Sequence, residues 1–150
     1  MNDFEKLADR IPEPPHGGLA APQGLEPRRA CFSGSRGFKN LELVDRVVAV
    51  LPPNTVVVHG GAHGVDQRAA ARAEALGYSC DVFIPQWKLY GKRAGPLRNA
   101  EMLATVDVLY AFWDRTSRGT YSTIMIANAM KLPMMVVFED GTDVTALDRR

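Results

Sequence analysis

Four short segments of the sequence combine glycines with hydroxyl, amide or basic side chains, a combination suited to contact with an anion. The first is Ser33-Gly34-Ser35-Arg36-Gly37. Glycine lets the backbone approach a ligand closely, and the N-terminus of a following helix attracts negative charge. Ser35 can donate a hydrogen bond, and Arg36 can clamp a phosphate or stack on a base. We interpret Gly34, Ser35 and Arg36 as ligand-binding residues, with a tight turn and a solvated arginine as the alternative.

The second segment runs from His59 to Asp66 and has three glycines within five residues. It ends at an acidic residue in the first turn of an expected helix, a pattern that describes a phosphate cradle followed by a capped helix. For Asp66, a structural role in satisfying backbone donors is at least as strongly favoured as ligand contact. We expect His59 to be packed at the strand end and His63 to be exposed. The candidate ligand-binding residues are Gly60, Gly61, Ala62 and Asp66.

The third and fourth segments also lie at expected helix starts. The third reads WKLYGKRAGPLRNAEM from Trp87 to Met102 and supplies aromatic, small and basic residues. The fourth runs from Asp114 to Thr120, and its helix N-terminus with the threonine hydroxyl forms another anion nest. For the aromatic rings of the third segment, core packing is an equal alternative to contact with ligand. The candidate ligand-binding residues are Trp87, Gly95, Pro96, Arg98, Asn99, Arg118, Gly119 and Thr120.

Several cofactor classes do not fit these segments. The GSRG run lacks the G-x-G-x-x-G spacing of a dinucleotide fingerprint, and no suitably placed acidic residue follows the second expected strand. Cys31 and Cys80 form no CxxC pair and have no histidine at metal-binding spacing, so we expect two reduced, buried thiols. We therefore expect no metal and no cofactor.

The elements that must position these segments alternate along the chain. Strands are expected at 30–33, 55–59, 79–84, 106–112 and 133–138, and helices at 40–51, 65–76, 95–104 and 120–131. This alternation predicts an α/β, Rossmann-like, doubly wound parallel sheet of about five strands, with helices on both faces. We expect the strand order 3-2-1-4-5, which the sequence alone does not fix. Each glycine cluster follows a strand, and ligands of such sheets bind at the carboxyl ends of the strands.

The first 28 residues differ from the rest. They form an expected irregular arm rich in proline and glycine, and residues 29–150 form the expected domain. Within the arm, residues 3–11 could make a short amphipathic helix with Phe4, Leu7 and Ile11 on one side. Packing of the arm on a partner subunit and a flexible tail are equally favoured.

Length and composition narrow the function classes. A chain of 150 residues is the usual size of one domain. The formal net charge of +1 disfavours nucleic acid as a partner, since dedicated nucleic-acid domains are often strongly basic. The sequence has no apolar stretch of membrane-spanning length and no basic segment leading into an apolar one, so we expect no membrane partner, no signal peptide and a cytoplasmic location.

Taken together and in order, the motifs resemble the SLOG superfamily, which unites the Smf/DprA DNA-processing proteins with the LOG phosphoribohydrolases. The pieces are GSRGF at 34–38, GGAHGVD at 60–66, W…YGKRAGPLRN at 87–99 and RGT at 118–120. They are most similar to the YspA/YpsA-related branch. The resemblance implies a Rossmann-like fold, a homodimer and a nucleotide or nucleotide-derived ligand.

The LOG enzymes cleave the N-glycosidic bond of nucleoside monophosphates, and the resemblance to them is incomplete here. Arg98 matches their helix-start arginine, but the PGG of their loop is altered and Thr123 stands where their catalytic glutamate would be. Such cleavage needs a carboxylate near the ribose. Arg98, Glu101 and Asp66 are the catalytic candidates.

We therefore expect a nucleotide-binding sensor or sequestering protein with little or no catalysis. A phosphoribohydrolase is the first alternative. Binding of single-stranded DNA, as in DprA, is the second.

Overall fold

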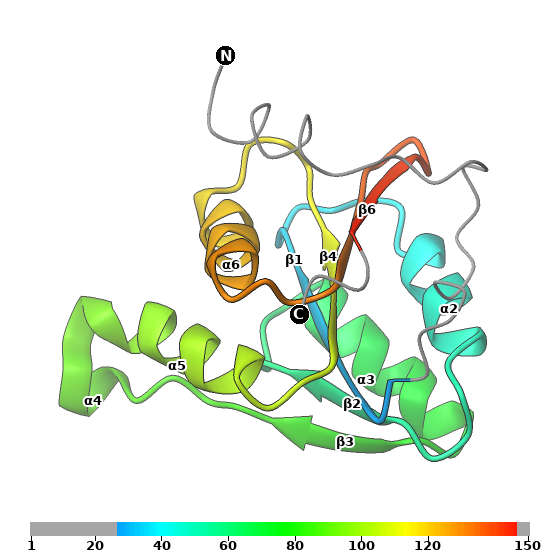
Figure 1. Ribbon diagram of the computed structural model, residues 1–150, viewed down its shortest axis with the longest axis horizontal. Helices are drawn as coiled ribbons and strands as arrows, with labels where there is room; N and C mark the ends of the chain where they lie inside the picture. Colours follow the sequence, from blue (N-terminus) through cyan, green and yellow to red (C-terminus); the bar gives the residue numbers. More distant parts are fainter. Residues whose placement is uncertain (1–26, 147–150) are drawn as a thin grey trace.

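The computed structural model describes residues 27–146, which fold into one sheet with helices on both faces (Figure 1). The strands are β1 (Arg29–Gly34), β2 (Val56–His59), β3 (Ser79–Val82), β4 (Val108–Phe112), β5 (Met134–Val137) and β6 (Asp143–Ala146). The helices are α2 (Glu42–Ala49), α3 (Val65–Ala75), α4 (Trp87–Tyr90), the 3-10 turn η1 (Gly91–Arg93), α5 (Ala94–Leu103) and α6 (Arg118–Ala129). Within the described range, no helix has both the length and the apolar character needed to span a membrane.

The strand order is β3-β2-β1-β4-β5-β6, and β1 to β5 all pair in parallel. The expected α/β class and the order of the first five strands are confirmed. Because the chain moves from β1 to β2 and β3 on one side and then returns to β4 on the other, the order reverses between β1 and β4. A crevice therefore opens at their carboxyl ends.

The core lies on both faces of the sheet, and residues of each strand alternate between them. In β1, Ala30 and Phe32 pack with α2 and α3, whereas Cys31 packs with α5 and α6. In β4, Tyr110 faces the first pair of helices and Leu109 the second. Burial on both faces explains why these strands are almost entirely apolar, as is typical of parallel sheets.

Two elements were missed by the expectations from sequence. Strand β6 pairs antiparallel with β5 and extends the sheet to six strands. It follows a tight turn in which the amide of Gly141 donates to the carbonyl of Phe138 and Gly141 has a φ of +86°. The Asp140-Gly141 dipeptide is a hairpin signal that could have revealed this strand. The second missed element is α4, a single turn ahead of η1 and α5.

Gly34 is the point where β1, α3 and β4 approach one another most closely. A Cβ atom built there would lie 2.7 Å from Val65 Cβ and 2.9 Å from the Phe112 carbonyl oxygen. Only glycine lets the first turn of α3 pack this close to the end of β1. The packing of this glycine thus holds the crevice in shape.

We expect Gly34→Ala to destabilise the fold by about 1–3 kcal/mol, since the added methyl group overpacks a rigid site. The matched control is Gly119→Ala in α6, where an added Cβ would meet nothing within 4 Å. That variant should be neutral or more stable by about 0.5–1 kcal/mol, because alanine is the better helix former. Urea unfolding of both variants measures this, and equal stabilities would contradict the close approach at Gly34.

Candidate functional site

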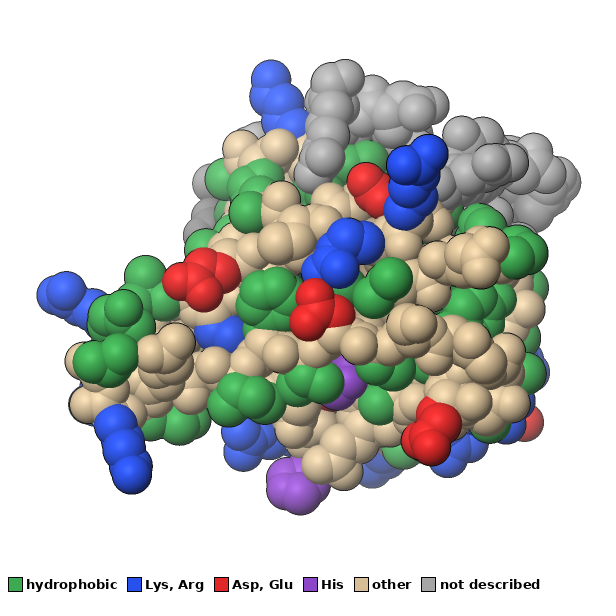
Figure 2. Space-filling model, turned by 90° about the horizontal axis from the view of Figure 1, so that it is seen from below, with side chains coloured by type: hydrophobic (Ala, Val, Ile, Leu, Met, Phe, Trp, Pro, Cys, Tyr) green, Lys and Arg blue, Asp and Glu red, His purple; other side chains and the backbone are tan. Residues whose placement is uncertain are grey.

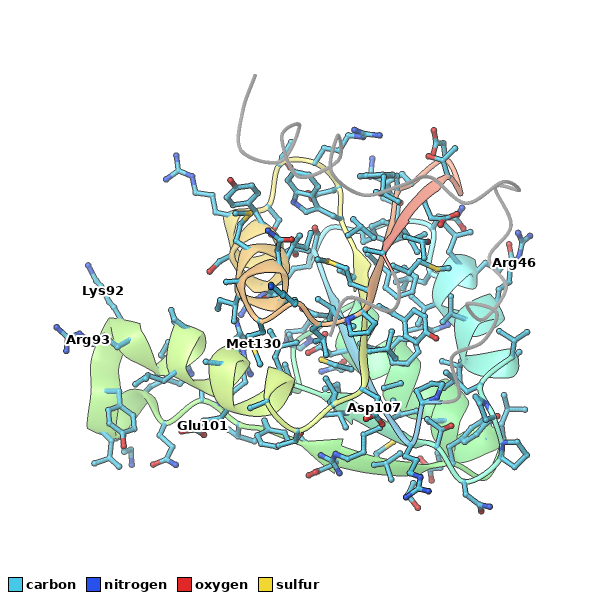
Figure 3. The ribbon with its side chains drawn as sticks, viewed as in Figure 1. Arg46, Lys92, Arg93, Glu101, Asp107 and Met130 are labelled. Atoms are coloured by element: carbon cyan, nitrogen blue, oxygen red, sulfur yellow. The ribbon has the colours of Figure 1, made fainter. Side chains whose placement is uncertain are left out.

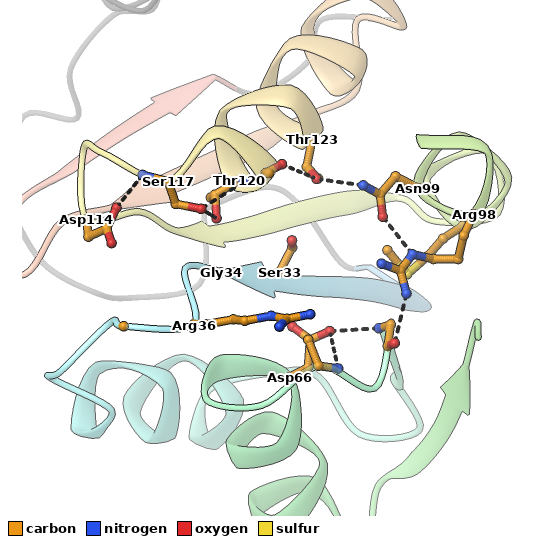
Figure 4. A pocket seen from close by; sticks show the side chains of 15 residues that line it. Ser33, Gly34, Arg36, Asp66, Arg98, Asn99, Asp114, Ser117, Thr120 and Thr123 are labelled. Atoms are coloured by element: carbon orange, nitrogen blue, oxygen red, sulfur yellow. Dashed lines mark hydrogen bonds between the residues drawn. The ribbon is translucent and has the colours of Figure 1, made fainter. Parts of the chain in front are cut away.

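A pocket of about 410 Å³ opens at the carboxyl ends of the central strands, where the strand order reverses (Figure 4). The loop after β1, the loop after β2, helix α5 and the start of α6 all contribute to its walls. Its lining residues are Ser33, Gly34, Arg36, Gly37, Gly60, Ala62, Asp66, Arg98, Asn99, Met102, Asp114, Ser117, Gly119, Thr120 and Thr123. In the described residues the glycine-rich loops after β1 and β2 therefore meet the start of α6 at one site.

The Asp66 carboxylate organises the loop after β2. Its Oδ2 accepts hydrogen bonds from the amides of Gly60 at 2.9 Å and Ala62 at 3.3 Å, although the side chain is in the first turn of α3. The residue is buried, with 5% of its surface exposed. Burial raises the pKa of Asp66 from its ordinary value to about 6, against the opposing effect of the two amides and of nearby arginines. The structural role expected for this carboxylate is confirmed.

Arg98 ties three segments together at the same place. Its Nη1 donates to the carbonyls of Gly60 at 2.8 Å and Phe83 at 3.0 Å, which joins α5 to the ends of β2 and β3. A Cβ atom at Gly60 would lie 2.8 Å from the guanidinium carbon, so this contact requires glycine. Nε donates to the Asn99 side chain at 2.7 Å. Because Nε and Nη1 are used in these bonds, Nη2 is the nitrogen of Arg98 that remains to donate to a ligand.

A chain of hydrogen bonds continues from α5 to the first turn of α6. Asn99 Nδ2 donates to Thr123 Oγ1 at 3.2 Å, and that hydroxyl donates to the Gly119 carbonyl at 3.1 Å. Figure 4 shows these groups on the wall opposite Asp66. Thr123 is thus in the pocket, but as a neutral hydroxyl that braces two helices.

The start of α6 is held by a second network. Ser117 is the N-cap residue and accepts from the Thr120 amide at 3.4 Å. Asp114 accepts from the amides of Thr116 and Ser117. Desolvation raises the pKa of Asp114, but these hydrogen bonds outweigh it and hold the pKa below its ordinary value. The pocket therefore contains one carboxylate that stays ionised and one, Asp66, that titrates near neutrality.

The Arg36 side chain extends across the pocket beside Asp66, as Figure 4 shows, and its charge acts on that carboxylate. With Arg98 it gives the pocket two cationic groups to set against two carboxylates. Both arginines lie near Asp66, and Asp114 lies at the start of α6, so donors and acceptors occur together along the pocket. The pocket suits a ligand that carries both an anionic group and hydroxyl or amino groups.

Most of the residues predicted from sequence meet in this pocket. Those that line it are Gly34, Arg36, Gly60, Ala62, Asp66, Arg98, Asn99, Gly119 and Thr120. Ser33, Gly37, Met102, Asp114, Ser117 and Thr123 also line it and were not among the predicted contacts. Gly37, Asp114 and Ser117 belong to the glycine-rich segments after β1 and β4, so the segments rather than single residues were the informative signal.

The other predicted contacts lie outside the lining. Ser35 is buried, and its hydroxyl lies 3.2 Å from that of Thr120 and accepts from the Asp114 amide, so it joins the loops after β1 and β4. Trp87 is 56% exposed, and its ring lies beside Gly95. Glu101 is exposed on α5 (Figure 3). Gly61, Gly95, Pro96 and Arg118 are likewise absent from the lining.

The remaining candidates for chemistry are accounted for as follows. His59 is buried and its Nδ1 accepts from the Gly61 amide, while His63 is exposed, as expected. Both cysteines are free, but only Cys31 is buried; Cys80 is exposed because β3 is an edge strand. Residues 27–146 contain no group of three or more His, Cys, Asp or Glu side chains that could hold a metal ion.

Asp66 generates a prediction about stability and pH. Because its pKa is raised in the fold, the native protein binds the proton more tightly than the unfolded chain. Stability therefore falls as pH rises from about 4 to about 7, and the loss from this group is on the order of 3 kcal/mol. Asp66→Asn keeps an oxygen for the two amides and should remove this loss. Urea unfolding across that pH range measures it, and parallel pH dependences for variant and wild type would contradict it.

Comparisons with known proteins agree with this architecture. The sequence model of the YspA, cpYpsA-related SLOG family matches residues 28–90. The "Gene 61 protein" of Mycobacterium phage D29 is 36% identical over 118 residues, which cover 72% of this chain and 94% of the phage protein. The X-ray structure of DNA processing protein A (DprA) from Streptococcus pneumoniae matches with a TM-score of 0.63 and 18% identity.

The DprA match covers 73% of this chain, and this chain spans 50% of the DprA chain. At that identity the likeness concerns the fold alone. The family match begins just before β1 and ends with α4, so it includes both glycine-rich loops that contribute to the pocket. The match to the phage protein covers 94% of that protein and 72% of this chain, so it extends beyond the residues that the family model matches. On these findings, the chain belongs to the YspA, cpYpsA-related SLOG family.

Proposed function

We propose that the pocket binds a nucleotide or nucleotide-derived small molecule, and that the protein acts as a sensor or sequestering protein with little or no catalysis. The observation that carries the proposal is the combination of donors and acceptors in one pocket at the point where the strand order reverses. Two arginines and a helix N-terminus supply donors, and two carboxylates supply acceptors. A volume of about 410 Å³ lies within the range of small-molecule sites.

The anionic group of the ligand would lie at the start of α6, and Arg36, which extends across the pocket toward Asp66, would contact it from the other wall. The first amides of a helix have no carbonyl partner within it. Ser117 takes up those of Thr120 and Tyr121, which leaves the amides of Arg118 and Gly119 for a bound group. The helix dipole adds to the attraction, and a guanidinium matches the geometry of a phosphate.

The sugar and base would lie toward Asp66, Arg98 and Asn99. Asp66 uses Oδ2 for both loop amides, so Oδ1 remains to accept a hydrogen bond from a ribose hydroxyl. We therefore do not place the phosphate at the loop after β2, because its amides at Gly60 and Ala62 already donate to a carboxylate.

Arg36 provides the test of this assignment. At a hundredfold excess over Kd, a ligand stabilises the folded state by about 2.7 kcal/mol. Adenosine monophosphate or ADP-ribose at millimolar concentration should therefore raise Tm by several degrees. Arg36→Gln should reduce the affinity about tenfold or more, because a charge-assisted bond to phosphate is lost.

The matched control is Arg118→Gln, which removes an exposed arginine next to the pocket but outside its lining. It should keep nearly the full thermal shift. Equal losses in both variants would mean that the effect is only one of net charge. The absence of any shift with nucleoside monophosphates, cyclic nucleotides and ADP-ribose would contradict the proposal.

Hydrolysis of an N-glycosidic bond is the second candidate, and the burial of Asp66 favours it. A carboxylic acid whose pKa is about 6 can give or take a proton near neutral pH. Glu101, the other carboxylate candidate, is exposed outside the pocket, and Thr123 supplies no carboxylate.

If this second candidate holds, base release from a nucleoside monophosphate should fall at least a hundredfold in Asp66→Asn and be unchanged in Glu101→Gln. Chromatography of the released base measures it. Intact substrate after long incubation with the wild-type protein would exclude hydrolysis while leaving ligand binding in place.

A further inference from the structure

One edge of the molecule carries an exposed hydrophobic surface, which we call the β3–α4 face. It consists of Val82, Ile84, Trp87, Leu89, Tyr90 and Leu97. Figure 2 looks toward this edge and shows hydrophobic side chains following β3 and gathering at the α4 end. Six of the nine large hydrophobic residues that are exposed in the described part of the chain belong to it. Such a concentration is unusual for a surface that faces only water.

The α4 end of the same face is positively charged, while Asp81 of β3, which pairs with Arg29, and the exposed Glu101 of α5 lie at its borders. No acidic residue occurs between Val82 and Ala100, whereas Lys88, Lys92 and Arg93 are all exposed there. Figure 3 shows Lys92 and Arg93 pointing outward from the turn between α4 and α5. The whole chain has a net charge of only +1, so this basic character is local. An occupant of the face should therefore be apolar on one side and acidic elsewhere.

The side chains of the face favour a protein segment over a nucleic acid. Four of the six are aliphatic. Bases stack on aromatic rings, whereas aliphatic side chains pack against apolar side chains. Trp87 and Tyr90 are 56% and 49% exposed, and aromatic anchors of this kind supply much of the energy of protein contacts.

The chain itself contains a segment with the matching properties. Residues 3–11 read DFEKLADRI and lie outside the described residues. Phe4, Leu7 and Ile11 recur at the spacing of one helix face, the pattern by which an amphipathic helix fits an apolar surface. Residues 3–11 carry three acidic and two basic side chains, and Glu13 follows, so the segment has an acidic excess where the face is basic.

The connection to the folded domain is long enough. The described chain begins at Pro27, whose carbonyl accepts from Thr55 Oγ1. Residues 12–26 can extend over roughly 45 Å at about 3.1 Å per residue. A domain of this size has a radius of gyration of roughly 14 Å, so the segment can reach any part of its surface. A tether of this length also gives an effective concentration in the millimolar range.

We propose that residues 3–11 dock as a short amphipathic helix on the β3–α4 face of the same molecule. Phe4, Leu7 and Ile11 contact the hydrophobic side chains of the face. The acidic side chains lie toward Lys88, Lys92 and Arg93. The function of the contact is to cover an apolar edge of the sheet that would otherwise recruit other chains.

Hydroxyl-radical footprinting of the full-length chain, read by mass spectrometry, tests this proposal. In the wild-type protein Trp87 and Tyr90 should be modified several times more slowly than in the variant Phe4→Asp/Leu7→Asp, which places charges on the docking side. The matched control is Ala20→Asp/Ala21→Asp, which adds the same two charges to the connecting residues. It should keep the wild-type protection. Trp113, 6% exposed, reports an intact fold and should react equally in all three.

Two results would overturn the proposal. Equal and rapid modification of Trp87 and Tyr90 in all three proteins would mean that nothing covers the face. Protection that persists in Phe4→Asp/Leu7→Asp, or that is lost on dilution of the wild-type protein, would identify a second copy of the chain as the occupant.

Discussion

The backbone of Gly60 is held from two directions. Its amide donates to the Asp66 carboxylate, and its carbonyl accepts from Arg98. Through these two bonds the end of β2 is joined to α3 on one face of the sheet and to α5 on the other. Arg98 also donates to the Phe83 carbonyl, which joins the end of β3 to the same place. A side chain at Gly60 would displace the guanidinium, so the bond from Arg98 to the Gly60 carbonyl depends on this glycine.

This arrangement decides which groups remain for a ligand. A glycine-rich loop is often taken as a phosphate cradle because its amides point outward together. Here the amides of Gly60 and Ala62 face a carboxylate of the same chain, and that of Gly61 faces His59. The free donors are instead at the start of α6 and on Arg36. Asp66 is thus left as an acceptor, and we therefore place the anionic group of a ligand at the start of α6 instead.

The sequence predicts the larger features well because they depend on periodicity. Buried strands such as Val56–His59 and glycine clusters after each strand lead to the α/β class and the position of the pocket. The expected order of five strands is also observed, although periodicity alone does not fix it. Strand β6 escapes because Asp143–Ala146 is short and follows a hairpin, which breaks the alternation of strands and helices. Cys80 was expected to be buried because it lies in an apolar, strand-like run, but that run is β3, which lies at the sheet edge.

The direction in which a side chain points is harder to predict from sequence than the segment in which the residue lies. Ser35 lies in the right loop but is buried between Thr120 and Asp114, and Trp87 precedes the pocket helix but is exposed. Both were chosen for their chemistry, but Ser35 is directed by partners far away in the chain, and the Trp87 ring lies beside Gly95. Thr123, by contrast, enters the pocket because α6 places it one turn after Gly119.

The central claim, that a nucleotide-type ligand binds with its anionic group at the start of α6, is most directly tested by a two-dimensional ¹⁵N NMR titration with adenosine monophosphate and ADP-ribose. The account predicts that the largest amide shifts occur at Gly37, Arg118 and Gly119, while the amides of Gly60 and Ala62 stay close to their positions in the free protein. Largest shifts at Gly60 and Ala62 would contradict the assignment of the anion site. Unchanged spectra with both ligands would contradict nucleotide binding itself.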